Sequence, residues 1–123
     1  MTEESEVVQK IRALCMALPE TVERPFGGHT APTFRVHDKM FVNTSEDGST
    51  MILKGAPGAQ EALIASNPET YFVPAYVGHR GWIGVRLDVA LDWEEMTELI
   101  EDSYRLIAPK RLLALLPDLP RFS

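Results

Sequence analysis

The stretch from residue 33 to residue 54 constrains the fold more than any other part of the chain, because turn residues divide it into three short segments. Polar and apolar side chains alternate in the first segment, with Phe34 and Val36 on one face, which is the pattern of a strand with one buried face. Turns this short join antiparallel neighbours, so the segments predict a meander. The strands are expected at Thr33–His37, Met40–Thr44 and Ser49–Lys54, with turns at Asp38-Lys39 and Ser45-Glu46-Asp47-Gly48.

Two amphipathic helices flank this meander. The first is predicted over residues 3–18, with Thr2 as its N-cap and Pro19 directly after its end. The last long helix begins at Asp92, which forms a capping-box pattern with Glu95. Apolar residues three and four positions apart are expected to enter the core: Val7, Ile11, Leu14, Cys15 and Leu18 in the first helix, and Trp93, Met96, Ile100, Tyr104 and Ile107 in the last.

The remaining segments are shorter. Residues 20–32 are predicted to form a loop or an irregular edge, because prolines and glycines interrupt both regular periods. A helix opens at Gly55-Ala56-Pro57 and closes at Asn67-Pro68, and a strand is expected over Trp82–Leu87. A short helix over Lys110–Leu116 is so rich in leucine that we expect the domain or a second copy of the chain to cover it.

Length, charge and cysteine content limit the possible classes of protein. The 123 residues correspond to one domain, residues 1–123, and the formal net charge of −6 opposes non-specific binding to nucleic acid or anionic lipid. The single cysteine, Cys15, allows no intrachain disulfide and is interpreted as a buried apolar residue. The acidic start lacks the pattern of a secretory signal, and no stretch is long and apolar enough for a membrane span. We therefore expect a cytoplasmic monomer or homodimer with no membrane partner.

Patterns typical of catalysis and metal binding are missing from the sequence. The histidines His29, His37 and His79 lie far apart, without a cysteine or carboxylate at ligand spacing. No nucleophile elbow, Walker loop or dinucleotide fingerprint occurs, so we expect no metal and no cofactor, and the sequence leans against an enzyme. The acidic residues of the last helix are predicted to form a solvated face: Glu94, Glu95, Glu98, Glu101 and Asp102.

The stretch Tyr71–Leu87 concentrates aromatic and cationic side chains and contains no Asp or Glu. Its Gly78-His79-Arg80-Gly81 segment matches the letters of the G-x-x-G loop of KH domains, but it leads into a strand instead of joining two helices. We therefore reject the KH assignment. The residue types still suggest a binding surface, in which aromatic rings stack on a ligand and cations attract an anion. Tyr76 is the aromatic residue expected to be exposed. The candidate ligand-binding residues are Lys54, Tyr76, His79, Arg80, Trp82 and Arg86.

Six short motifs, taken in their order and spacing, resemble those of the MmcQ/YjbR family of small bacterial proteins. They are Pro25-Phe26-Gly27, Lys39-Met40-Phe41, Leu53-Lys54, Pro74-Ala75-Tyr76, Arg80-Gly81-Trp82 and Ser103-Tyr104. The family typically has Asn-Lys-x-x-Trp where this chain has Gly78-His79-Arg80-Gly81-Trp82, so a cation is kept and the polar contacts differ. The resemblance implies a YjbR-like α+β fold, similar to secretion chaperones and described as double-wing, with an antiparallel sheet and helices mainly on one face. It also implies the label of DNA-binding protein and no catalytic activity.

Three functions remain open at this point. The first is nucleic-acid binding. The second is a binding module for a small molecule or an anion such as phosphate, an enzyme included, with Lys54, His79, Arg80 and Arg86 as its cationic wall. The third is a protein-binding adaptor or chaperone. A salt titration separates the first two, because binding to nucleic acid releases several counterions and weakens steeply with salt.

Overall fold

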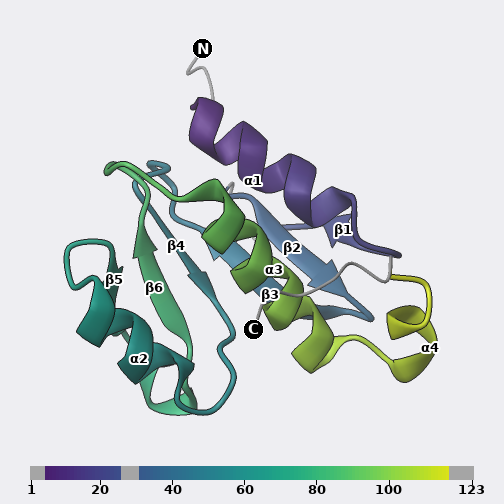
Figure 1. The fold of residues 1–123 in the computed structure, drawn as a ribbon. Coiled ribbons are helices and arrows are strands. Elements are labelled where there is room, and N and C mark those ends of the chain that lie inside the picture. Colours follow the sequence, from purple (N-terminus) through teal and green to yellow (C-terminus); the bar gives the residue numbers. More distant parts are fainter. Residues whose placement is uncertain (1–4, 26–30, 117–123) are drawn as a thin grey trace.

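The protein is built on a six-stranded sheet with helices packed on one of its faces (Figure 1). The structure is a computed structural model that describes residues 5–25 and 31–116. Neighbouring strands are antiparallel throughout, in the order β1-β2-β3-β4-β6-β5. The strands are β1 Val22–Glu23, β2 Thr33–Val36, β3 Lys39–Thr44, β4 Thr50–Leu53, β5 Tyr71–Phe72 and β6 Ile83–Arg86.

Three helices cover one face of this sheet, and a short fourth helix follows the last of them (Figure 1). They are α1 Glu6–Met16, α2 Ala59–Ser66, α3 Trp93–Ile107 and α4 Lys110–Leu113, and a 3₁₀ turn, η1, spans Gly78–Arg80. Helix α1 contacts β2, α2 contacts β5, and α3 contacts β3 and β4. None of the helices in the described residues is long and apolar enough to cross a membrane. The predicted α+β class, with an antiparallel sheet and helices mainly on one face, is confirmed.

Helices α1 and α2 both begin later than the sequence predicted. In α1 the N-cap is Ser5, whose Oγ accepts a hydrogen bond from Val8 N at 3.2 Å. The predicted cap, Thr2, lies outside the described residues. In α2 the N-cap is Gly58 with a φ of 85°, so Pro57 precedes the helix instead of lying in its first turn. A proline in the segment before a helix fits this geometry equally well, because its φ suits an extended or turn conformation.

The predicted meander is present as β2, β3 and β4, with a shift at its first turn. Val36 pairs with Lys39, so the turn residues are His37 and Asp38 rather than Asp38 and Lys39. His37 and Asp38 have φ values of 50° and 64°. A two-residue hairpin of type I′ requires positive φ at both positions, which explains the shift.

The segment expected to be a loop or an irregular edge, residues 20–32, contains a short strand at the edge of the sheet. In β1, Val22 lies opposite Arg35 and Glu23 lies opposite Phe34. Two residues are too few to show an alternating pattern, so only the pairing with β2 reveals this strand. Residues 26–30, which include His29, lie outside the described residues.

A register shift between β2 and β3 makes Phe41 an extra residue on β3. Phe41 and Val42 are consequently both 0% exposed, although strict alternation would place neighbouring residues on opposite faces. The Phe41 ring meets the Tyr104 ring of α3 edge to face, with the ring centroids 5.6 Å apart. The bulge therefore adds an aromatic anchor to the contact between the sheet and α3.

Helix α3 buries the middle of its predicted apolar stripe and leaves the first residue at the rim. Met96, Ile100 and Tyr104 are buried in the core. Trp93, which we expected to be a core residue, is half-buried, and Lys10 of α1 lies over its ring at 5.0 Å from the centroid. Its position at the start of α3 explains the difference, because the ring packs beside α1 instead of under the helix.

The leucine-rich helix α4 is shorter than predicted and is covered by the body of the chain. Leu112 is 0% exposed and belongs to the core, and Leu113 and Leu116 pack against that core. Leu115 is 64% exposed. Intrachain packing therefore covers most of this helix, which was the first of the two possibilities left open by the sequence.

Candidate functional site

The segment between β5 and β6, residues 73–82, forms an ordered turn that we call the β5–β6 loop. Gly78 N donates to Pro74 O at 3.1 Å, and Gly81 N donates to Gly78 O at 3.0 Å. Gly81 has a φ of 84°, a conformation that favours glycine. These hydrogen bonds give the loop a defined backbone from which its side chains project.

A buried glutamine of α2 binds both the middle and the end of this loop. Gln60 Nε2 donates to Gly78 O at 2.8 Å and to Trp82 O at 2.7 Å, and Gln60 is 8% exposed. We did not predict this role from the sequence. The available signal was a polar residue on the same helical face as Leu63 and Ile64, where an apolar residue would be expected.

The segment after β4 meets the β5–β6 loop at two glycines. A Cβ atom added to Gly55 would lie 2.7 Å from Gly81 O, so a larger residue would force the two segments apart. Because Lys54 precedes Gly55 and Arg80 precedes Gly81, this contact brings the backbones of both cationic residues to the same end of the sheet.

Three of the candidate residues lie on this loop and are exposed to solvent. Tyr76 is 94% exposed and has a φ of 66°, which is uncommon for a residue with a side chain. His79 and Arg80 are also exposed. An exposed ring beside a guanidinium can stack on a planar group while the cation binds an adjacent anion. The predicted exposure of Tyr76 is confirmed.

Two other candidate residues are occupied by contacts within the protein. Trp82 is 7% exposed, so its ring is not presented for stacking. The Arg86 guanidinium lies 4.9 Å from the centroid of the Phe72 ring, and Arg86 Nη1 donates to Pro68 O at 3.2 Å and to Glu69 O at 3.3 Å. Arg86 remains half-exposed and contributes charge to the surface, whereas Trp82 contributes packing.

On the side away from the helices, the strands present a basic face. Their register places Arg35, Arg86 and Phe72 on that side, opposite the buried side chains. Glu23 is the only carboxylate in the six strands, and its ion pair with Arg12 of α1, at 2.7 Å, places it on the helix side. The helix-free face of the strands therefore carries two arginines and no strand carboxylate, although the whole chain carries −6.

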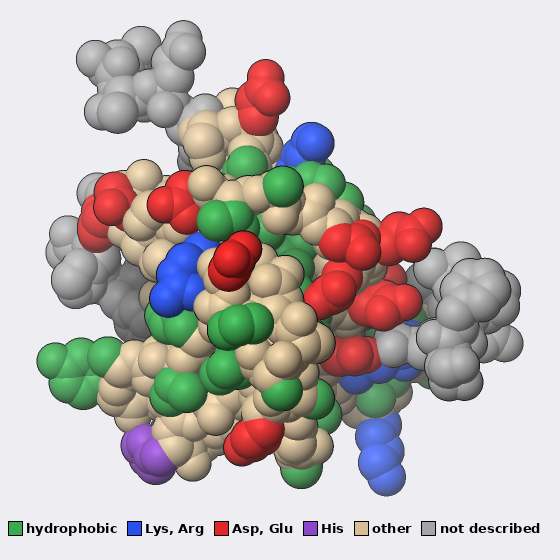
Figure 2. Space-filling view, turned by 60° about the vertical axis from the view of Figure 1, so that its left-hand side comes forward, with side chains coloured by type: hydrophobic (Ala, Val, Ile, Leu, Met, Phe, Trp, Pro, Cys, Tyr) green, Lys and Arg blue, Asp and Glu red, His purple; other side chains and the backbone are tan. Residues whose placement is uncertain are grey.

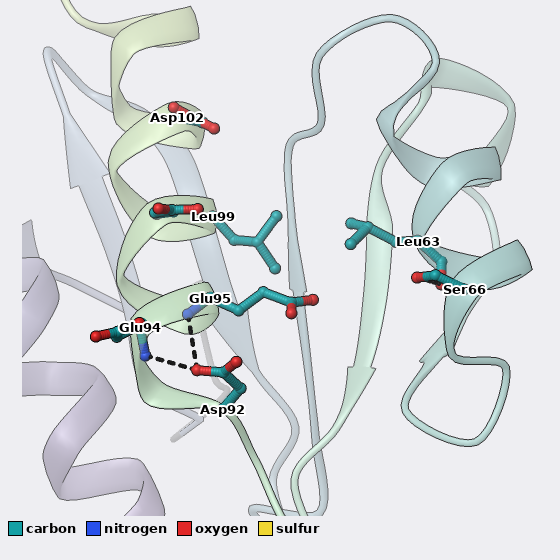
Figure 3. Close-up of a pocket in the computed structure, with 8 residues that line it drawn as sticks. Leu63, Ser66, Asp92, Glu94, Glu95, Leu99 and Asp102 are labelled. Atoms are coloured by element: carbon teal, nitrogen blue, oxygen red, sulfur yellow. Dashed lines mark hydrogen bonds between the residues drawn. The ribbon is translucent and has the colours of Figure 1, made fainter. Parts of the chain in front are cut away.

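Negative charge gathers on the helix side, in a groove of about 390 Å³ between α2 and α3. Leu63 of α2 and Leu99 of α3 point toward each other across it (Figure 3). Figure 2 shows acidic side chains gathered together on one side of the molecule. The acidic residues of α3 were predicted to form a solvated face. Glu95 differs from this prediction, because its carboxylate accepts a hydrogen bond from Tyr71 Oη. The carboxylates that line the groove are Asp92, Glu94, Glu95, Glu98 and Asp102.

Neither a group of metal ligands nor an accessible thiol is found in residues 5–25 and 31–116. In this part of the chain, no group of three or more His, Cys, Asp or Glu side chains could hold a metal ion. Cys15 is 0% exposed, and burial, with a smaller contribution from the charge of Glu23, raises the pKa of its thiol. A thiol that stays protonated suits a core residue and not a nucleophile.

The fold and the surfaces described above define a class of small α+β proteins whose antiparallel sheet keeps one face free of helices. A family model described as YjbR matches residues 16–106, and the chain belongs to the YjbR family. The crystal structure of protein DR2400 from Deinococcus radiodurans, described with the domain DUF419, is similar with a TM-score of 0.76. The two chains are 25% identical, over 90% of this chain and 89% of that one. No curated protein matches this chain.

Proposed function

We propose that this protein binds nucleic acid through the β5–β6 loop and the helix-free face of the sheet. The observation that carries the proposal is Tyr76, which is 94% exposed on the same hydrogen-bonded loop as the exposed His79 and Arg80. A ring held in this way can stack on an unpaired base, while the neighbouring cations contact the phosphates beside that base. The proposal therefore concerns single strands in the first place.

The distribution of charge supports this orientation of the ligand. The strands offer Arg35 and Arg86 on the helix-free face, whereas the carboxylates of the α2–α3 groove lie on the helix side. Phosphates are attracted to the first surface and repelled by the second. Because the net charge of −6 opposes the approach of a polyanion, we expect modest affinity that falls steeply as salt is added.

The test is fluorescence anisotropy with a labelled mixed-sequence DNA of about 20 nucleotides, single-stranded and as a duplex, at increasing KCl. We expect tighter binding to the single strand and a linear decrease of the logarithm of the association constant with the logarithm of salt concentration. Equal affinity for the single strand and the duplex would contradict the proposal that Tyr76 stacks on an unpaired base. No binding to either form at low salt would contradict the proposed function.

Variants locate the binding surface. Arg80→Ala should lower the affinity by about 1.5–3 kcal/mol, the range for hydrogen bonds to charged groups, and Tyr76→Ala by about 1–3 kcal/mol. The free energy of unfolding should change by less than about 0.5 kcal/mol, because both side chains are exposed. Lys39→Ala is the matched control, since it removes one positive charge at the exposed first residue of β3. Equal losses in Arg80→Ala and Lys39→Ala would show non-specific attraction only.

A small phosphate-bearing ligand is the second candidate for the same surface. The net charge of −6 favours it, because a single small anion needs only local cations and feels less long-range repulsion than a polyanion. Calorimetry with inorganic phosphate and a nucleoside monophosphate separates the candidates. A small ligand that binds with weak salt dependence, together with no binding of DNA, would favour this alternative.

A further inference from the structure

We propose that Gln60 is a positioning residue that holds the β5–β6 loop in its binding conformation. The inference deepens the proposed function and rests on it, because the loop carries the side chains assigned to the ligand. Gln60 itself lies in α2, is buried, and donates hydrogen bonds to two backbone carbonyls of the loop. It would act on the ligand through the loop and not by contact.

The contact needs a nitrogen that can donate two hydrogens, and the Gln60 amide supplies it without adding a charge. An amide NH₂ has two hydrogens, and both are directed at carbonyl oxygens, Gly78 O and Trp82 O. The first carbonyl lies in η1 and the second lies directly before β6. A single side chain thus fixes the 3₁₀ turn relative to the strand that follows it.

Leucine and glutamate, which are similar to glutamine in size, cannot replace this contact. Leucine has no hydrogen-bond donor, so both buried carbonyls would lose the hydrogen bond that they accept from Gln60. An ionised glutamate would place a negative charge against two carbonyl oxygens. A protonated glutamate has one hydrogen to donate and could bind only one of the two carbonyls.

The backbone of the loop explains why such a restraint is needed. Tyr76 has a φ of 66°, and a side chain in this region persists only where its surroundings hold it. If the restraint is removed, the loop populates other conformations, and the apparent affinity falls in proportion to the fraction that remains competent. A loop that is competent about one tenth of the time would weaken binding about tenfold.

Three variants of the full chain test the inference: Gln60→Leu, Gln60→Glu and, as a control, Glu61→Gln. Glu61 is exposed on the same helix, so its substitution changes α2 without touching the loop. Hydrogen exchange of the Arg80 and Gly81 amides reports loop order without any ligand, because both donate within the loop. Anisotropy with the single-stranded DNA probe reports binding.

We expect Gln60→Leu to speed exchange at these two amides at least tenfold, to leave exchange in α3 unchanged, and to weaken DNA binding about tenfold. Gln60→Glu should behave in the same way at neutral pH and regain part of the protection as acid protonates its carboxyl group. If Gln60 only stabilised the fold, its substitution would lower the melting temperature, and protection of the loop amides in Gln60→Glu would not change with pH. Glu61→Gln should match the wild type.

Unchanged exchange at Arg80 and Gly81 in Gln60→Leu would overturn the inference, as would loss of protection in α3 to the same degree. If Gln60→Leu does not fold, Gln60→Glu tests the inference. Protection of its Arg80 and Gly81 amides, measured relative to the intrinsic exchange rate, must rise as the pH is lowered, and no such rise overturns the inference. If the wild type binds no DNA while both Gln60 variants loosen the loop, the proposed function fails and the structural part of the inference is supported.

Discussion

At the scale of single residues, a buried hydroxyl of α3 joins two strands of the sheet. Ser103 is 0% exposed, and its Oγ donates to Phe41 O at 2.8 Å and accepts from Lys54 N at 3.0 Å. Phe41 is the bulge residue of β3, and Lys54 follows the end of β4. The serine thereby satisfies a donor and an acceptor at the point where the ladder between these strands ends.

We predict that Ser103→Ala lowers the free energy of unfolding by about 1–3 kcal/mol, because both backbone groups lose a buried partner. Urea denaturation monitored by circular dichroism measures the change. Ser66→Ala is the control, since Ser66 Oγ donates to Leu63 O at 3.0 Å on the exposed end of α2 and its loss should cost less than about 0.5 kcal/mol. Equal costs in the two variants would show that burial of Ser103 adds nothing.

At the scale of elements, the start of α3 combines a cap with a link to the sheet. Asp92 Oδ1 accepts from Glu94 N at 3.0 Å and from Glu95 N at 3.3 Å, as the sequence predicted (Figure 3). The Glu95 carboxylate accepts a hydrogen bond from Tyr71 Oη. Glu95, the glutamate of the capping-box pattern, thus links the first turn of α3 to Tyr71 of β5.

Asp92→Ala should destabilise the protein by about 1 kcal/mol, the usual cost of losing an N-cap oxygen. The measurement is thermal and urea unfolding followed at 222 nm. Asp88→Ala, another exposed acidic residue before the same helix, serves as the control and should cost less than about 0.5 kcal/mol. A cap contribution would be refuted by Asp92→Ala unfolding at the wild-type urea concentration.

At the scale of the whole molecule, the helices and the sheet share one hydrophobic core. Side chains from α1, α3, α4 and the strands β2, β3, β4, β5 and β6 all contribute to it. The core holds apolar side chains together with Cys15, which has no second cysteine to pair with. Such a core can form without a disulfide or a metal.

We therefore predict that the chain folds alone, as one domain. Excess chelator or dithiothreitol should leave the melting temperature unchanged in differential scanning calorimetry. A loss of about 1 kcal/mol would already shift the melting temperature of a domain of this size by several degrees, so the measurement is sensitive. A fall of that size with chelator would reveal a stabilising metal, and with dithiothreitol a stabilising disulfide.

Sequence periodicity predicted the features that depend on neighbours a few positions apart. The cap at Asp92 and the buried stripe through Met96, Ile100 and Tyr104 both follow from local spacing. The short hairpin turns were also predictable, because their turn-forming residues are consecutive in the sequence. The first turn, His37-Asp38, was predicted to within one residue. The exposure of Tyr76 follows from its position among loop residues.

The tertiary structure decided the features whose partners lie far along the chain. Gln60 finds its carbonyls 18 and 22 positions away, Ser103 reaches one 62 positions away, and β6 lies between β4 and β5 in the sheet. Burial of Trp82 and the contact of Arg86 with Phe72 depend on the same long-range arrangement. Local propensity carries no information about such pairings, because they form only when distant segments are brought together around a shared core.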